Sequence, residues 1–418
     1  MASDLTISTD PGEVGLDAHR LERLDRRLAQ WVDDAQLPGF LVTVSRHGRL
    51  AHVGKYGRRD VERNLPVEDD TRWRIYSMTK PITSVAAMML YEEGAFELGD
   101  PISKWLPEFA EPRVYVAGSD QKAVTVPATE PIRVRHLLTH MSGLTYGFHR
   151  AHPVDGMYRA MGHEWGTPPG ADSAEVTRQW ASMPLVFQPG SAWNYGVSTD
   201  VLGRLVEVIS GQPLDAFFEQ RIFGPLGMAD TSFGLRESDD VDSLAKLYLA
   251  APGQPGGPSS SMTYMEAFDV AAHSKPAFLS GGGGLVSTAG DYLRFVELLR
   301  RGGSYDGGRL LGSRTIAHMV RNHLPGNQDL ETFGRPLFAE TPLRGVGFGL
   351  GFSMVLDPAR YGVVSSVGDY SWGGAASTAF YVDPVEDVTV TFYTQLLPSS
   401  TLPIRNYLRA LVNQALVD

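Results

Sequence analysis

The chain has 418 residues, of which 43% are hydrophobic and 20% charged, with a formal net charge of −11 and no cysteine. Its length suggests two or three units at roughly 100–200 residues per domain. The acidic balance without a long basic run excludes a nucleic-acid backbone as a partner, and the lack of cysteine excludes disulfides, thiolate metal sites and a cysteine nucleophile.

The first twenty residues are acidic and show neither the charged segment nor the apolar segment of a secretory signal. No stretch reaches the ~18 apolar residues that a membrane span needs. We therefore expect a cytoplasmic protein without a membrane span, although a chain whose signal had been removed would show the same pattern.

The first quarter of the chain predicts a helix, a β-hairpin and a second helix. Apolar residues at three- and four-residue steps indicate an amphipathic helix over about 17–35, and the apolar runs 40–46 and 49–57 flank a glycine-containing turn. An apolar stripe then predicts a helix that begins near Ser77 and ends at Gly94.

The rest of the chain changes character twice. Residues 106–284 give helical segments separated by long Pro/Gly/Ser loops, of which 250–262 is the clearest. The C-terminal part predicts helices over about 288–301, 313–322 and 402–416, and strands over 347–356, 362–368, 377–384 and 387–395. We predict an α/β domain made of residues 1–105 and 285–418, with 106–284 as an inserted, mainly helical domain with long loops.

The spacing Ser-x-x-Lys occurs three times, at Ser77/Lys80, Ser119/Lys122 and Ser243/Lys246. The last two lie in polar surroundings and are interpreted as solvated surface. Ser77 lies at the start of an apolar helix, where Lys80 follows on the same face and free N–H groups favour a developing oxyanion. An N-cap serine beside a lysine that extends to water is the alternative interpretation.

A serine nucleophile needs a base, and Tyr195 is the second candidate for that role. It precedes a helix predicted to start near Ser198, so it stands at a loop–helix junction. Lysine or tyrosine serves as a base where the surroundings disfavour its protonated form. Core packing is the commoner role of a tyrosine, and the position alone leaves both readings open.

Five segments in order resemble the serine β-lactamase and penicillin-binding-protein superfamily, on its class C β-lactamase-like branch. The three motif segments are SMTK (77–80), NYGV (194–197) and WGG (372–374), and the two structural ones are RVRHLLTHMSGL (133–144) and LSGGGGLVSTAGDYLRF (279–295). Together they span about 50–380. The resemblance implies a β-lactamase/transpeptidase-like α/β (α+β) fold, an antiparallel sheet flanked by helices.

The resemblance also implies roles for individual residues in a serine acyl-enzyme mechanism. Ser77 would be the nucleophile, Lys80 and Tyr195 a proton-transfer pair that shares one proton, and the backbone N–H groups of Ser77 and Ala375 the oxyanion hole. Ala375 is expected to follow an edge strand. The expected substrate-binding residues are Trp372, Gly373, Gly374, Trp193, Val197 and Tyr146.

Two positions depart from the lactamases and peptidases of this superfamily. Trp372 stands where they carry Lys or His, and Val197 replaces an amide-bearing residue. Both changes remove polar groups that help to bind a carboxylate or an amide, and a Trp-Gly-Gly motif resembles the family VIII carboxylesterases. We therefore expect a serine hydrolase that cleaves small-molecule carboxylic esters of short to medium acyl chain, with weak β-lactamase side activity.

Alternatives remain on the same fold: an acyltransferase, an amide or peptide hydrolase, or a catalytically silent scaffold. A zinc site at His136 and His140 lacks the glutamate of a zinc protease, and Gly281–Gly284 are expected to form a tight turn because no phosphate-binding Gly-Lys-Ser/Thr follows. We predict no metal and no cofactor; the sequence leaves the oligomeric state open. An apolar pocket is expected from Tyr146, Phe148, Trp193, Tyr370 and Trp372, with scaffold packing as the alternative.

Overall fold

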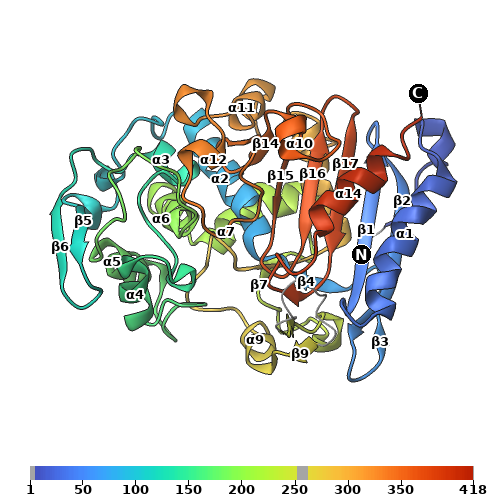
Figure 1. Ribbon diagram of the computed structural model, residues 1–418, viewed down its shortest axis with the longest axis horizontal. Helices are drawn as coiled ribbons and strands as arrows, with labels where there is room; N and C mark the ends of the chain where they lie inside the picture. Colours follow the sequence, from blue (N-terminus) through green and yellow to red (C-terminus); the bar gives the residue numbers. More distant parts are fainter. Residues whose placement is uncertain (1–4, 252–261, 418) are drawn as a thin grey trace.

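The computed structural model describes residues 5–251 and 262–417, and its centre is an antiparallel sheet whose strands come from both ends of the chain (Figure 1). In spatial order the strands are β13 (Val346–Phe348), β14 (Ser353–Val355), β15 (Tyr370–Gly373), β16 (Ala379–Asp383), β17 (Val388–Tyr393), β1 (Gly39–Arg46), β2 (Arg49–Asp60) and β3 (Leu65–Pro66). Val42 of β1 lies opposite Phe392 of β17, so N-terminal and C-terminal strands pair inside the sheet. The predicted fold class is confirmed, whereas the domain boundaries at 105 and 284 stay a prediction.

Helices cover both faces of this sheet. One face packs against α1 (Ala18–Asp33) and α14 (Ile404–Asn413), whose Trp31 and Tyr407 rings meet at 5.3 Å (Figure 1). On the other side, α10 (Ala289–Arg300) packs against β16 and β17, and the buried α2 (Thr79–Glu92) packs against α6 (Ser198–Ser210). α2 is buried nearly all round because its sequence is apolar on most faces, as expected of a helix in a core.

The remaining elements are short. Between α2 and α10 the chain forms β5 (Arg113–Gly118), β6 (Ala123–Pro127), α3 (Val134–Leu138), α4 (Pro153–Ala160), α5 (Ser173–Ala181), α7 (Leu214–Phe218), α8 (Gly224–Leu226), β7 (Ser232–Phe233), β8 (Tyr248–Ala250), β9 (Met262–Tyr264), α9 (Glu266–Ala271) and β10 (Leu285–Thr288). Elsewhere lie β4 (Arg72–Arg74), β11 (Ser304–Tyr305), β12 (Gly308–Arg309), α11 (Ser313–Met319), α12 (Leu330–Phe333), α13 (Pro358–Tyr361) and β18 (Leu396–Leu397). Two small sheets, β4-β10-β7 and β18-β8-β9, join the middle segment to the rest. None of the described helices is long and apolar enough to cross a membrane.

Three predictions about the C-terminal strands were wrong. Residues 362–368 form no strand: β14 pairs directly with β15, and Val364 and Val367 are exposed between left-handed glycines. Residues 347–356 make two strands, because Gly351 (φ 96°) turns the chain there. β15, expected at an edge, has a partner on each side. Of the predicted loop 250–262, residues 252–261 lie outside the described residues.

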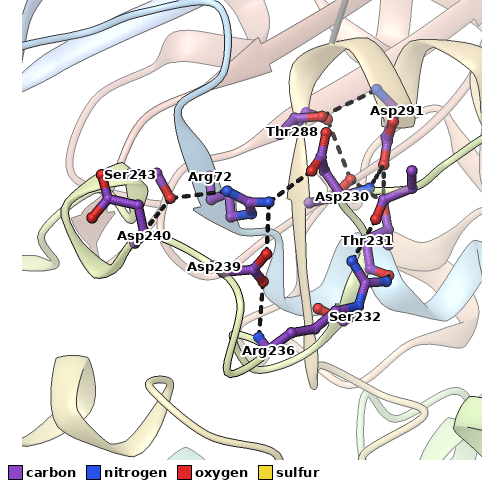
Figure 2. Close-up of polar contacts among 12 residues, drawn as sticks. Arg72, Asp230, Thr231, Ser232, Arg236, Asp239, Asp240, Ser243, Thr288 and Asp291 are labelled. Carbon is purple, nitrogen blue, oxygen red and sulfur yellow. Dashed lines mark hydrogen bonds and ion pairs between the residues drawn. The ribbon is translucent and has the colours of Figure 1, made fainter. Parts of the chain in front are cut away.

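An ionic cluster fixes the segment that carries the third Ser-x-x-Lys pair (Figure 2). Arg72 of β4 donates to Asp230 at 2.7 Å, Asp239 at 3.0 Å and the Ser243 hydroxyl at 3.1 Å. Asp291 of α10 accepts from the Thr231 hydroxyl at 2.9 Å. Ser243 is therefore buried in a structural network, and its interpretation as solvated surface was wrong.

Candidate active site

Ser77 lies in a short 3-10 turn, Tyr76–Met78, directly before α2. Tyr76 has φ 43°, a left-handed conformation that non-glycine residues adopt at a cost and that often marks functional sites. The turn is held by the Ile75 N–H, which donates to the Leu285 carbonyl at 3.1 Å. No side chain caps α2, so the interpretation of Ser77 as an N-cap was wrong.

The Ser77 hydroxyl is the meeting point of the predicted catalytic residues. Tyr195 donates from its hydroxyl to Ser77 Oγ at 2.6 Å, and Lys80 Nζ donates to the same oxygen at 3.1 Å. Lys80 also donates to the Tyr146 hydroxyl at 3.0 Å and to the Gly282 carbonyl at 2.7 Å. Only 1% of Lys80 is exposed, so the alternative in which it extends to water was wrong.

Burial sets the protonation of this group. It lowers the pKa of Lys80 to about 8, because the ammonium loses its hydration, and the charges of Asp200 and Glu340 oppose the shift. Burial together with the Glu340 charge raises the pKa of Tyr195 well above its ordinary value. Near neutral pH the site therefore combines a protonated phenol with an amine that loses its proton easily.

Asp200 of α6 holds the carbonyl that receives Lys80. Its carboxylate accepts from the Ser280 hydroxyl at 2.5 Å and from the Gly282 N–H at 2.9 Å. A Cβ on Gly282 would lie 2.3 Å from the same carboxylate, so this position requires glycine. The predicted tight turn at 281–284 is confirmed, and it supplies a ligand for the lysine rather than a phosphate cradle.

The third motif meets the nucleophile turn through Gly374. A Cβ there would lie 2.4 Å from the Ile75 carbonyl, two residues before Ser77, so the two segments touch through backbone atoms. Ala375 is half-buried in the turn that follows β15. A Cβ on Gly373 would likewise lie 2.3 Å from the guanidinium of Arg405. The placement of Ala375 beside the Ser77 turn supports its predicted oxyanion role, which stays a prediction.

Two tryptophans surround the Tyr195 ring. Trp193 stacks on it at 6.2 Å between ring centroids, and Trp372 meets it edge-on at 5.5 Å. Both tryptophans are only 1% exposed, and Val197 is buried just before α6. These contacts support the tyrosine directly; the substrate-binding role of the three residues stays a prediction.

Tyr146 begins a row of stacked rings that leads away from Lys80. It stacks on Phe148 at 4.7 Å, and Phe148 stacks on Trp165 at 5.2 Å, where 63% of the tryptophan is exposed. We call Tyr146, Phe148 and Trp165 the aromatic row. The row connects Lys80 to the protein surface. Tyr370, also expected in the apolar pocket, packs instead against Phe352.

Sequence reasoning missed Asp200, Glu340 and the Gly282 carbonyl. None of them belongs to a spacing pattern, and their effect on Lys80 depends on contacts across the fold. The one available signal was an aspartate in the first turn of an otherwise apolar helix, at Asp200. The spacing of His136 and His140 resembles that of a zinc pair, but each has another contact: His136 accepts from the Arg133 N–H, and His140 packs on Tyr195.

The chain is similar to known proteins over nearly its whole length. Residues 24–414 match the family described as Beta-lactamase. Esterase EstB of Burkholderia gladioli is 33% identical over 405 residues, 93% of each chain, and lovastatin esterase of Penicillium rubens is 30% identical over 86% of this chain and 89% of its own. The solved structure of EstCE1, described as a hydrolase with promiscuous acyltransferase activity, is 28% identical and has a TM-score of 0.78 over 95% of this chain and 98% of its own.

Proposed function

We propose, from the premise that this chain belongs to the Beta-lactamase family, that it cleaves carboxylic esters of short to medium acyl chain through an acyl-enzyme on Ser77. Its relatives are named esterases and acyltransferases, and the chain is a serine ester hydrolase or acyltransferase on the β-lactamase fold. The observation that carries the finer proposal is Ser77 Oγ at 2.6 Å from the Tyr195 hydroxyl and 3.1 Å from Lys80 Nζ. A small-molecule ester as partner and a cytoplasmic location belong to the proposal.

In the first half of the proposed reaction, neutral Lys80 takes the Ser77 proton while Oγ bonds to the ester carbonyl carbon. The backbone N–H groups of Ser77 and Ala375 stabilise the oxyanion. The Tyr195 hydroxyl then protonates the alcohol oxygen as the C–O bond breaks, and Lys80 returns its proton to the phenolate. Lys80 and Tyr195 act as one coupled proton-transfer pair.

In the second half, water bonds to the acyl carbon and gives one proton to neutral Lys80. Ser77 Oγ leaves with the proton of the Tyr195 hydroxyl, and Lys80 then returns its proton to the phenolate. An alcohol in place of water gives acyl transfer, the alternative favoured by the likeness to EstCE1. Product analysis with added short alcohols measures how the acyl group partitions between the two acceptors. Transfer dominates only if the alcohol outcompetes water for the acyl group.

The deciding experiment compares Ser77→Ala with Ser119→Ala. Ser119 has the same spacing to a lysine, but its hydroxyl only accepts from the Lys122 N–H in an exposed loop. With p-nitrophenyl butyrate, we expect Ser77→Ala to lose turnover and the acyl adduct seen by mass spectrometry, and Ser119→Ala to keep both. Turnover in a folded Ser77→Ala protein contradicts the mechanism, and lack of any turnover in the wild type favours the silent scaffold.

A further inference from the structure

Hydrogen bonds hold the segment that follows α12, and with it Arg335, against the NYGV motif (194–197) and the preceding Trp193. The Trp193 N–H donates to the Phe333 carbonyl at 3.2 Å, and the Arg335 N–H donates to the Trp193 carbonyl at 3.0 Å. The Arg335 guanidinium donates to the Asn194 side-chain oxygen at 3.1 Å. The cation is thus held by the residue that directly precedes Tyr195.

Arg335 is half-buried, and no carboxylate of the described residues lies within ion-pair distance of it. Asp155, the carboxylate whose charge acts on it, accepts instead from the Thr145 hydroxyl at 2.9 Å and from the His152 N–H at 3.0 Å. Burial lowers the pKa of Arg335, whereas the other arginines with displaced pKa values have carboxylate partners that raise them. A partly desolvated guanidinium without a counter-ion is an unusual arrangement.

The same segment reaches the aromatic row. Phe338 meets Phe148 edge-on at 6.1 Å, and His149, beside Phe148, hydrogen-bonds through Nε2 with the Tyr195 carbonyl at 2.8 Å. Arg335 and the row are therefore both anchored next to Tyr195, the arginine through Asn194 and the row through Tyr146. A ligand that rests its apolar part on the row would bring a polar group toward the guanidinium.

We propose that Arg335 binds a carboxylate of the substrate, so that the preferred esters carry a free carboxylate besides the scissile bond. The planar guanidinium presents parallel N–H donors that match the two oxygens of a carboxylate. One guanidinium nitrogen donates to Asn194, and the remaining N–H groups supply the two parallel donors that a carboxylate needs. This inference rests on the proposed function and names its substrate class.

Two substrate pairs test it, one for each side of the ester bond. Mono-4-nitrophenyl adipate is compared with 4-nitrophenyl hexanoate, and 4-acetoxybenzoate with its methyl ester. For each pair the measured quantity is the ratio of kcat/KM, charged over neutral. We expect the wild type to prefer the charged member of at least one pair, and Arg335→Gln to lower that ratio about tenfold, mainly through KM.

Two further variants separate charge from fork geometry and from general electrostatics. Arg335→Lys keeps the positive charge but loses the two parallel N–H donors, so it should give an intermediate ratio. Arg309→Gln removes an exposed arginine on β12 and should leave the ratio as in the wild type. No preference in the wild type, or an equal loss on both members of each pair in Arg335→Gln, overturns the inference. Ser77-dependent turnover of the neutral esters meanwhile keeps the proposed function intact, so the two fail separately.

Discussion

Lys80 donates to the Gly282 carbonyl at 2.7 Å, closer than its 3.1 Å contact with Ser77 Oγ. Lys80 is therefore oriented by a glycine turn far along the chain, and that turn is itself held by Asp200. Orientation of the amine depends on this second contact as much as on the Ser-x-x-Lys spacing.

Asp200→Asn should lower kcat for p-nitrophenyl butyrate about tenfold. The amide keeps the size of the side chain but loses the charge and half of its acceptors, so the Gly282 turn and the lysine shift together. Steady-state kinetics at saturating ester measure the effect. Asp242→Asn, at an exposed ion pair with Arg63, is the matched control, and equal kcat in both variants would contradict the positioning role.

The pH dependence of kcat/KM should follow the Lys80 amine. Burial lowers the pKa of Lys80 to about 8, and only the neutral amine accepts the Ser77 proton. On a neutral ester, kcat/KM should rise about tenfold per pH unit below that value and level off above it. A flat profile between about pH 6 and 9 would show that Lys80 is not the proton acceptor.

Glu340→Gln should shift the rising part of the kcat/KM profile to lower pH. The Glu340 charge raises the pKa of Lys80, so its removal lowers that pKa further. The carboxylate also accepts from the Ser399 hydroxyl at 3.0 Å and from Arg405 at 2.6 Å, so the substitution disturbs packing as well as charge. Ser399→Ala removes one of these bonds and keeps the charge, so its kcat/KM should rise over the same pH range as in the wild type.

Trp372 should make the protein a poor β-lactamase. Its indole is buried against Tyr195 and carries no charge, whereas the lactamases of this superfamily have a Lys or His at this position that helps to bind the antibiotic's carboxylate. We expect kcat/KM for a chromogenic cephalosporin at least about tenfold below that for p-nitrophenyl butyrate. Comparable values would show that the third motif does not decide between lactams and esters.

Arg409 and Asp369 form a buried pair whose disruption should destabilise the fold. Two hydrogen bonds of 2.8 Å join them, and their side chains are 4% and 1% exposed. Arg409→Ala leaves the carboxylate buried without its cation and should lower the free energy of unfolding by about 3–5 kcal/mol. Arg178→Ala breaks an exposed pair with Glu175 and should leave the urea midpoint close to that of the wild type. Urea unfolding of both variants tests the contrast.

Features with a strong local pattern could be predicted from the sequence. Apolar spacing predicts α1, whose ends differ from the prediction by one or two residues, and the ordered motifs predict that Ser77, Lys80 and Tyr195 meet. The segment 362–368 was wrongly predicted as a strand because it contains three valines in seven residues. A strand also needs a partner, and β14 and β15 already pair with each other.

The supporting residues could not be predicted in the same way. Glu340, Asp200 and Arg335 act through neighbours that lie far away in the sequence, and charged residues of these types are ordinarily solvated. Only the fold shows that both carboxylates act through their charge on a buried lysine and that, among the described residues, no carboxylate lies within ion-pair distance of the arginine.

The pairing of β1 with β17 imposes an order on biosynthesis. The β1–β2 hairpin is synthesised early, but the free edge of β1 pairs with β17, in which Tyr393 lies opposite Leu41. β17 is synthesised more than three hundred residues later. Until then the unpaired N–H and C=O groups of β1 are open to pairing with other chains, a hazard that chaperones limit during translation. A nascent chain likewise contains Ser77 298 residues before Ala375 (375 − 77), so the Ser77 turn forms long before the segment that follows β15 can pack beside it.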